Sequence, residues 1–395
     1  MIRAQKKHKP GKHEEIPMIL FLLTFFLLYG LLHLYIFLKI SSALTFGTLT
    51  TIFLLFFMAI MFGAPVIVRV SERYGFELLA RLISYIGYTW MGLAFLFFSF
   101  SVIIDLYRFF VYASGLVLQT GLSYMVPSPR FAFFVPLVAT SLIASYGYLE
   151  ARSIRNETII IKSPKIPREV GTLTIAQISD VHLGLIVRQG RLKRIVSEVK
   201  RAEPDILVST GDLVDGQIDT LAGLAELLNV INPRYGKFAT TGNHEFYAGL
   251  DQALHFTEKA GFTILRGEAL NVAGIITIAG VDDPTGKYFG LFRGLSERGL
   301  LSGVPRERFT LLLKHIPVVD ENALGLFDLQ LSGHTHKGQI FPFRLLTKLF
   351  FKTDAGLVHL SNNSYLYVNR GSGTWGPPIR FLSPPEVTII ELVHG

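Results

Sequence analysis

The pattern of apolar and polar residues divides the chain into two parts near residue 150. Charged residues are sparse between Met18 and Leu149, where Phe, Leu and Ile recur without a regular polar face. From Glu150 onward, short apolar runs alternate with polar segments, as they do in soluble α/β domains. The pattern therefore predicts a lipid-facing N-terminal part, at 17–150, and a soluble domain at 151–395.

Four uncharged runs in the first part are each long enough to cross a bilayer, which takes about 20 apolar residues in a helix. These runs are Met18–Leu38, Ala43–Val68, Leu82–Ile104 and Phe131–Leu149. A fifth uncharged stretch, Phe109–Val126, is diluted by Ser, Thr, Gln and Gly. We interpret it as an interfacial or re-entrant segment, with a fifth span as the alternative, and expect an α-helical transmembrane region of about four spans.

Basic residues suggest how this region is oriented. Five of them (Arg3, Lys6, Lys7, Lys9 and Lys12) lie in the first 16 residues, which we interpret as a basic cytoplasmic tail. Short loops rich in Lys and Arg stay in the cytoplasm. With four spans, both ends of the chain and the soluble domain are then cytoplasmic, in a multi-pass protein of the inner membrane. A fifth span would reverse the soluble domain.

The amino-acid composition indicates which kinds of partner to expect. Hydrophobic residues make up 50% of the chain and charged residues only 17%, which fits a membrane protein. The sequence has no cysteine, so disulfides and thiolate metal ligands are excluded. The net charge is +8, but much of it lies in the tail and just after the last apolar run. That placement favours a membrane surface as the partner, and no nucleic acid is expected.

The soluble part repeats one unit, a short apolar strand followed at once by polar residues. The predicted strands are Leu173–Ile178, Ile206–Ser209, Phe238–Thr240, Phe309–Leu313 and Leu329–Leu331. Between the first two, Arg191–Arg201 has its apolar residues on one helical face, which predicts a strand–helix–strand unit with parallel strands. Parallel strands end at one edge of a sheet, so the five polar clusters should converge there.

The converging side chains offer imidazole nitrogens and oxygens. They are Asp180, His182, Asp212, Asn243, His315, His334 and His336. This donor set suits Mn, Fe or Zn, and argues against Ca or Mg alone. Each cluster taken singly is common in turns and loops, but five in order are not expected by chance. Seven donors suit two divalent ions with a bridging carboxylate, which together clamp a phosphoryl group and supply a bridging hydroxide.

The order of these clusters resembles the calcineurin-like metallophosphoesterase family. The family pattern of D-x-H, G-D-x-x-D, G-N-H-[D/E], a later H and G-H-x-H is matched between Thr172 and Glu391. The resemblance implies an α/β fold, a four-layer αββα sandwich of two mixed sheets. Within the expected domain at 151–395, the resemblance implies a metal-dependent phosphoric ester hydrolase.

The resemblance also assigns roles. One metal is implied to be held by Asp180, His182, Asp212 and His336, and the second by Asp212, Asn243, His315 and His334. His244 is implied as the catalytic residue, a general acid or a stabiliser of transition-state charge, with Glu245 orienting it. Asp215 is expected to orient a ligand histidine. Arg188, Lys337 and Arg370 are either substrate-phosphate ligands or ordinary solvated charges.

The ending YVNRGSGTWGPPIR (Tyr367–Arg380), together with Gly280–Asp283, resembles a bacterial membrane-associated subgroup of that family. More loosely, it resembles UDP-2,3-diacylglucosamine pyrophosphohydrolases. We expect hydrolysis of a phosphodiester, phosphomonoester or pyrophosphate bond in a phosphorylated lipid or other membrane-proximal substrate. Alternatives are a pyrophosphohydrolase of that kind, a tethered phosphatase of soluble substrates, or a non-catalytic scaffold. The amphipathic stretch Ile340–Phe351 is either an interfacial element or a helix covering the core.

Overall fold

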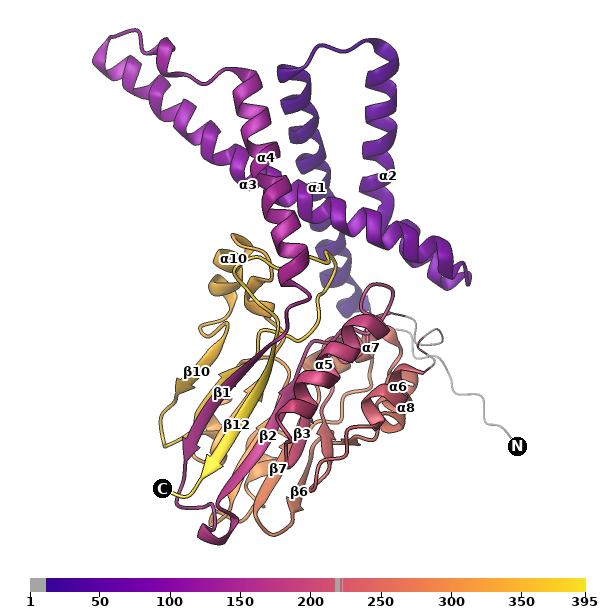
Figure 1. Cartoon of the computed structure of the whole chain (residues 1–395), viewed down its shortest axis with the longest axis vertical. Coiled ribbons are helices and arrows are strands. Elements are labelled where there is room, and N and C mark those ends of the chain that lie inside the picture. Colours follow the sequence, from indigo (N-terminus) through magenta and orange to yellow (C-terminus); the bar gives the residue numbers. More distant parts are fainter. Residues whose placement is uncertain (1–11, 217–220, 222) are drawn as a thin grey trace. The chain divides into compact units, whose positions relative to one another are not determined.

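The computed structural model describes residues 12–216, 221 and 223–395, and the first eleven residues of the basic tail lie outside this part. The described chain forms two compact units (Figure 1). The helical unit comprises Lys12–Leu149 together with Gly376–Phe381. The second unit comprises Glu150–Trp375 together with Leu382–Gly395, and we call it the catalytic unit because the resemblance implies catalysis there. A segment near the C-terminus thus belongs with the helices, which the apolar pattern did not indicate.

The helical unit contains four long helices: α1 (Lys12–Ala43), α2 (Thr48–Arg73), α3 (Glu77–Leu118) and α4 (Pro129–Glu150). Each includes a stretch long and apolar enough to cross a bilayer, which confirms a transmembrane region of about four spans. Within the fifth uncharged stretch, Phe109–Val126, the residues up to Leu118 continue α3 and do not form a separate helix. The helix stops only at Gln119, whose φ of 52° is left-handed.

Two groups of polar side chains pair inside the helical unit. The Trp90 indole donates to His33 Nε2 at 3.0 Å, so the proton of this imidazole lies on Nδ1, which donates to the Tyr29 carbonyl at 2.7 Å. Because α3 is longer than expected, it also contains an acidic residue, Asp105, which binds Lys39 at 2.5 Å. These groups hold helices together, as buried polar groups in a bilayer must.

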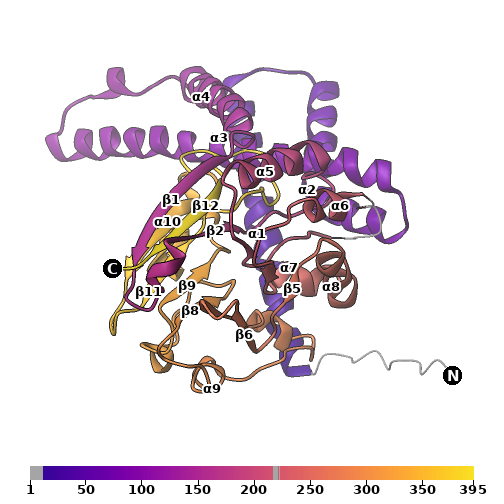
Figure 2. The ribbon, with the colours of Figure 1, turned by 60° about the horizontal axis from the view of Figure 1, so that its bottom comes forward.

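The catalytic unit contains two six-stranded mixed sheets (Figures 1 and 2). The first has the order β1 (Arg155–Lys162), β12 (Glu386–Val393), β2 (Thr172–Ile178), β3 (Ile206–Ser209), β4 (Lys237–Ala239), β5 (Thr263–Ile264). The second has the order β10 (Gly356–His359), β11 (Tyr365–Val368), β9 (Leu329–Ser332), β8 (Phe309–Leu313), β7 (Ile276–Gly280), β6 (Glu268–Val272).

The two sheets face each other across one core. Ile175 and Val208 of the first sheet pack in a single buried cluster with Ile278 and Leu331 of the second. Helices α5 (Gln189–Arg201), α6 (Leu224–Asn229) and α8 (Leu250–Lys259) cover the outer face of the first sheet (Figure 2). Short helix α9 (Glu297–Leu301) lies against the outer face of the second. The four-layer αββα sandwich is confirmed.

The strand directions that matter for the site also agree with the prediction. Strand β2 runs parallel to β3, with Ile175 beside Ile206, and α5 connects the two. Strand β3 runs parallel to β4, and in the other sheet β8 runs parallel to β9. The carboxyl ends of these strands therefore meet at one end of the sandwich, where the polar clusters follow them.

Candidate metal centre

Each predicted metal donor follows the end of a parallel strand. Asp180 and His182 follow β2, and Asp212 follows β3. Asn243 follows β4 and begins the short helix α7 (Asn243–Ala248). In the second sheet, His315 follows β8, and His334 and His336 follow β9. The structure brings all seven into one cluster.

The backbone around the donors is strained. Five of the seven have left-handed φ angles: Asp180 (49°), His182 (52°), Asp212 (52°), His334 (69°) and His336 (47°). Such a conformation costs a non-glycine residue about 1–3 kcal/mol. Hydrogen bonds between the turns hold it, since Asp180 N donates to the Gly211 carbonyl at 3.1 Å and His182 N donates to the Asp212 carbonyl at 3.0 Å. Concentrated strain of this kind is typical of a functional site.

The donors form two groups that share Asp212. In the first, His182 Nε2 lies 3.1 Å from His336 Nε2, which lies 3.4 Å from an oxygen of Asp180. In the second, Asn243 Oδ1 lies 3.1 Å from His334 Nδ1 and 3.2 Å from His315 Nε2. Asp212 Oδ2 lies 3.7 Å from His182 Nε2 and 3.2 Å from His315 Nε2, so it reaches both groups.

The chemistry of this cluster fits divalent cations. His315 Nδ1 lies 2.8 Å from the Thr210 carbonyl and must donate to it, so Nε2 is the nitrogen available to bind a metal. Nε2 faces the oxygens of Asp212 and Asn243, so three atoms that can bind a metal converge at this point. Burial lowers the pKa of His182 to about 3, so this ligand is a neutral imidazole, the form a metal binds. The residues present therefore suit two metal ions.

Glu245 holds the two central turns together. Its buried carboxylate accepts from the backbone N–H groups of Asp212 at 2.9 Å, Leu213 at 2.7 Å and Gly242 at 2.7 Å. The expectation that Glu245 orients His244 is wrong. Glu245 is the third residue of α7, and its side chain folds back over the helix start instead of reaching the neighbouring imidazole.

His244 is oriented by Asp215, whose Oδ1 lies 2.8 Å from Nδ1. The expectation that Asp215 orients a ligand histidine is therefore wrong as well. The ring of His244 stands edge-on to His182, with centroids 4.6 Å apart, and so borders the donors without being one of the seven. Burial by itself would lower the pKa of His244, but Asp212 and Asp215 raise it to about 9.

Aromatic side chains border the centre, and sequence reasoning gave them no role. The rings of Tyr247 and Trp375 lie 5.5 and 5.9 Å from that of His244, and both side chains are about half exposed. Trp375 is fixed through its backbone, which exchanges hydrogen bonds of 2.9 and 3.0 Å with the Gln339 side chain. The sequence signal that could have pointed to Trp375 is the stretch GTWG, in which an aromatic residue lies in a glycine-containing turn.

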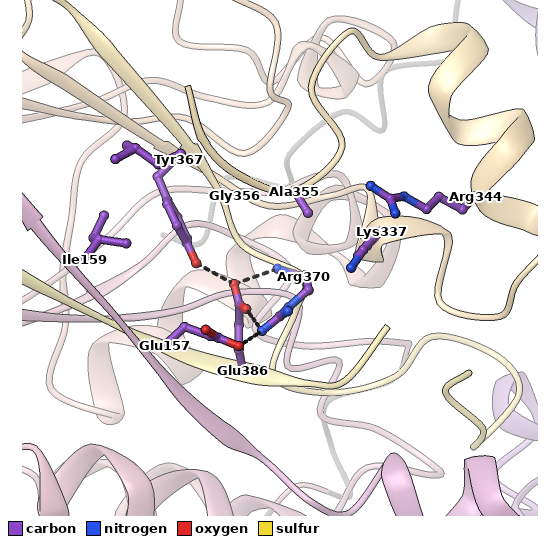
Figure 3. A pocket seen from close by; sticks show the side chains of 10 residues that line it. Glu157, Ile159, Lys337, Arg344, Ala355, Gly356, Tyr367, Arg370 and Glu386 are labelled. Carbon is purple, nitrogen blue, oxygen red and sulfur yellow. Dashed lines mark hydrogen bonds and ion pairs between the residues drawn. The ribbon is translucent and has the colours of Figure 1, made fainter. Parts of the chain in front are cut away.

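A separate pocket of about 290 Å³ lies between the outer strands of the two sheets (Figure 3). Arg370 lines this pocket and forms ion pairs with Glu157 and Glu386, so its guanidinium is already bound by carboxylates of the protein. Tyr367 also donates to Glu386, at 3.1 Å. The interpretation of Arg370 as a substrate-phosphate ligand is therefore not supported. Lys337 lines the same pocket, and Arg188 immediately precedes α5.

Comparison with known proteins supplies independent information. The sequence profile of the calcineurin-like phosphoesterase family matches residues 173–338. An uncharacterized metallophosphoesterase of Aquifex aeolicus is 43% identical over 64% of this chain and 96% of its own length. A transmembrane protein with metallophosphoesterase domain from Danio rerio is 34% identical over 65% of this chain and 61% of its own length. A solved dimetal phosphatase from Danio rerio is 13% identical, with a TM-score of 0.36, over 50% of this chain and 87% of that one.

Proposed function

Because this chain belongs to the calcineurin-like phosphoesterase family, we propose that it hydrolyses a phosphoester of a lipid-linked or otherwise membrane-proximal substrate. Family membership makes the chain a metal-dependent phosphoester hydrolase. The four apolar helices make it a membrane protein. We further propose Mn, Fe or Zn as the metal, because the donors are imidazoles and oxygens.

The residues of the metal centre suggest how the reaction is catalysed. Asp180, His182, Asp212 and His336 would hold one ion, and Asp212, Asn243, His315 and His334 the other. When bound, the two ions neutralise phosphoryl charge and lower the pKa of a coordinated water. Nδ1 of His244 is hydrogen-bonded to Asp215, so Nε2 can deliver a proton to the leaving oxygen. Glu245 fixes the turns that carry Asp212 and Asn243.

The observation that carries the substrate class is the apolar border beside His244. If His244 protonates the leaving oxygen, the leaving group lies on the side where Tyr247 and Trp375 present half-exposed rings. Such rings favour an apolar or flat leaving group over a small hydrated one. The catalytic unit also follows the last apolar helix closely in the chain, since α4 ends at Glu150 and β1 begins at Arg155.

The test is a comparison of paired substrates with the full-length protein, purified in detergent and loaded with Mn. Each pair is a phospholipid or nucleotide-linked lipid and the same head group without acyl chains. We expect a higher kcat/KM for the acylated member of at least one pair, with Asp212→Ala as the blank. Equal turnover of both members in every pair would favour a merely tethered phosphatase of soluble substrates.

We also propose that the catalytic unit lies on the cytoplasmic face of the inner membrane. The Lys and Arg residues of the tail and of the segment after α4 support this orientation. Since the chain has no native cysteine, Ser153→Cys and Ser41→Cys provide single labelling sites on opposite sides. A membrane-impermeant maleimide added to spheroplasts should label Cys at 41 and spare it at 153. The reverse pattern would place the catalytic unit outside.

A further inference from the structure

Helix α10 (Phe343–Phe350) turns its apolar side away from the protein. The exposed fractions are 59% for Leu345, 77% for Leu349 and 80% for Phe350, whereas the buried residue of the helix is Thr347. A helix that covers a soluble core has the opposite arrangement, with its apolar stripe inward. Of the two interpretations of this stretch from the sequence, the core-covering helix is therefore wrong.

The orientation of α10 is fixed by its polar side. Arg344 donates two hydrogen bonds, of 2.6 and 3.1 Å, to the carboxylate of Asp354, which is buried. The Asp354 backbone carbonyl accepts a hydrogen bond of 2.6 Å from the Thr335 hydroxyl. In the sequence, Thr335 lies between the candidate donors His334 and His336. Rolling the leucines inward would break the ion pair and leave a buried carboxylate unpaired, which is costly. The outward apolar face is thus built into the structure.

The charges around this face favour a lipid surface as its occupant. Lys348 and Lys352 flank it, both are exposed, and neither makes an ion pair in the described part of the chain. An apolar stripe between basic residues is the pattern of helices that lie in a bilayer interface, where cations meet anionic head groups. A protein partner would account for the apolar face but would give the two lysines no particular role.

Covalent connections bring a bilayer within reach of α10. Residues 151–154 join α4 to β1, and four residues span at most about 15 Å. A second connection runs through Gly376–Phe381, which belongs to the helical unit. Trp375, just before that segment, is hydrogen-bonded to Gln339, four residues before α10.

We propose that the apolar face of α10 inserts into the interface of the bilayer that anchors the chain, and thereby sets the metal centre against the lipid head groups. The residue after the helix, Phe351, stands edge-on to the metal donor His334, with ring centroids 5.6 Å apart. An interfacial helix enters the head-group region by about 5–10 Å. The end of α10 therefore joins the lipid surface directly to the centre. This inference rests on the proposed membrane-proximal function and adds the surface that would make the contact.

Fluorescence of a labelled cysteine can test the insertion, because the full-length chain has no native cysteine. Leu349→Cys and Phe350→Cys are each labelled with the environment-sensitive dye NBD, and Val230→Cys is the matched control. Val230 is an apolar residue of the catalytic unit, exposed by 57% and remote in sequence from α10. The proteins are placed in nanodiscs of phosphatidylcholine and phosphatidylglycerol, with or without doxyl-labelled lipid.

Insertion predicts blue-shifted emission at 349 and 350 and a loss of fluorescence when doxyl lipid is present, with neither effect at 230. Replacing phosphatidylglycerol with phosphatidylcholine should weaken quenching at 349 and 350. A blue shift without quenching would mean that another protein, such as a second copy, covers the face, and would overturn the inference. Fluorescence at 349 and 350 that matches 230 in both respects would overturn it equally.

A second measurement separates this inference from the proposed function. Each labelled variant is assayed in detergent with bis(p-nitrophenyl) phosphate, and unchanged turnover shows that the catalytic unit is folded. Lipid quenching at 349 and 350 with no preference for acylated substrates would uphold the insertion and reject the lipid-linked substrate. A preference for acylated substrates without quenching would reject the insertion and uphold the lipid-linked substrate.

Discussion

Replacing Asp212 with asparagine should lower kcat/KM for any phosphoester by at least about 10³-fold, equivalent to about 4 kcal/mol of transition-state stabilisation. The reason is its position, since one carboxylate oxygen lies 3.7 Å from His182 and 3.2 Å from His315 and so serves both donor groups. An amide keeps the size of the side chain but removes the negative charge that two adjacent cations need. The measurement is steady-state kinetics together with the metal content of the purified protein.

The matched control makes the same chemical change on the surface. Asp251 is an exposed residue in the first turn of α8, and Asp251→Asn should retain activity and metal content. The assignment of Asp212 as the shared ligand would be wrong if Asp212→Asn kept two metal ions per chain and stayed within about tenfold of the native rate.

Replacing His244 with glutamine should have an effect that depends on the leaving group. General acid catalysis contributes about 10²–10⁴-fold, and it matters most when the leaving oxygen is strongly basic. We therefore expect a loss of about that size for an alkyl phosphodiester, and a much smaller loss for a p-nitrophenyl ester, whose leaving group needs no proton. Asp215→Asn should show the same dependence in weaker form, because Asp215 orients the ring.

A control variant and the metal content decide how the His244 result is interpreted. His255 is an exposed histidine of α8, so His255→Gln is the neutral control for the same substitution. Equal losses of rate for both esters in His244→Gln would contradict a proton-donating role and would leave stabilisation of phosphoryl charge as the function of this side chain. Metal content should stay unchanged, because His244 is not among the seven donors.

The convergence of the seven candidate donors could be predicted because its signal is local. A short apolar strand followed at once by Asp, Asn or His can be seen in the sequence, and the parallel arrangement of β2 and β3 follows from the helix between them. The parts that failed depend on three-dimensional proximity. Glu245 is next to His244 in sequence, but its carboxylate accepts from the backbone of Asp212, and Asp215, 29 positions earlier, is the residue that reaches His244.

Longer-range features were harder to predict for the same reason. Strand β12 lies between β1 and β2, although it is the last strand in the sequence, and no pattern within it specifies that place. The helical period of Phe343–Phe350 predicts an amphipathic helix, but the outward direction of its apolar face follows from the ion pair between Arg344 and Asp354.

The segment Gly376–Phe381 has a consequence for how the protein is made. It is part of the helical unit, where Ile379 and Arg380 are buried and Arg380 N donates to the Gly147 carbonyl at 3.0 Å. Synthesis must pass from residue 150 to residue 376 before that segment leaves the ribosome, which takes roughly 10–50 s at 5–20 residues per second. During this interval the spans can already be inserted, while the position beside Gly147 that Ile379 occupies is still empty. Final closure of the membrane unit therefore waits for nearly all of the catalytic unit to be translated.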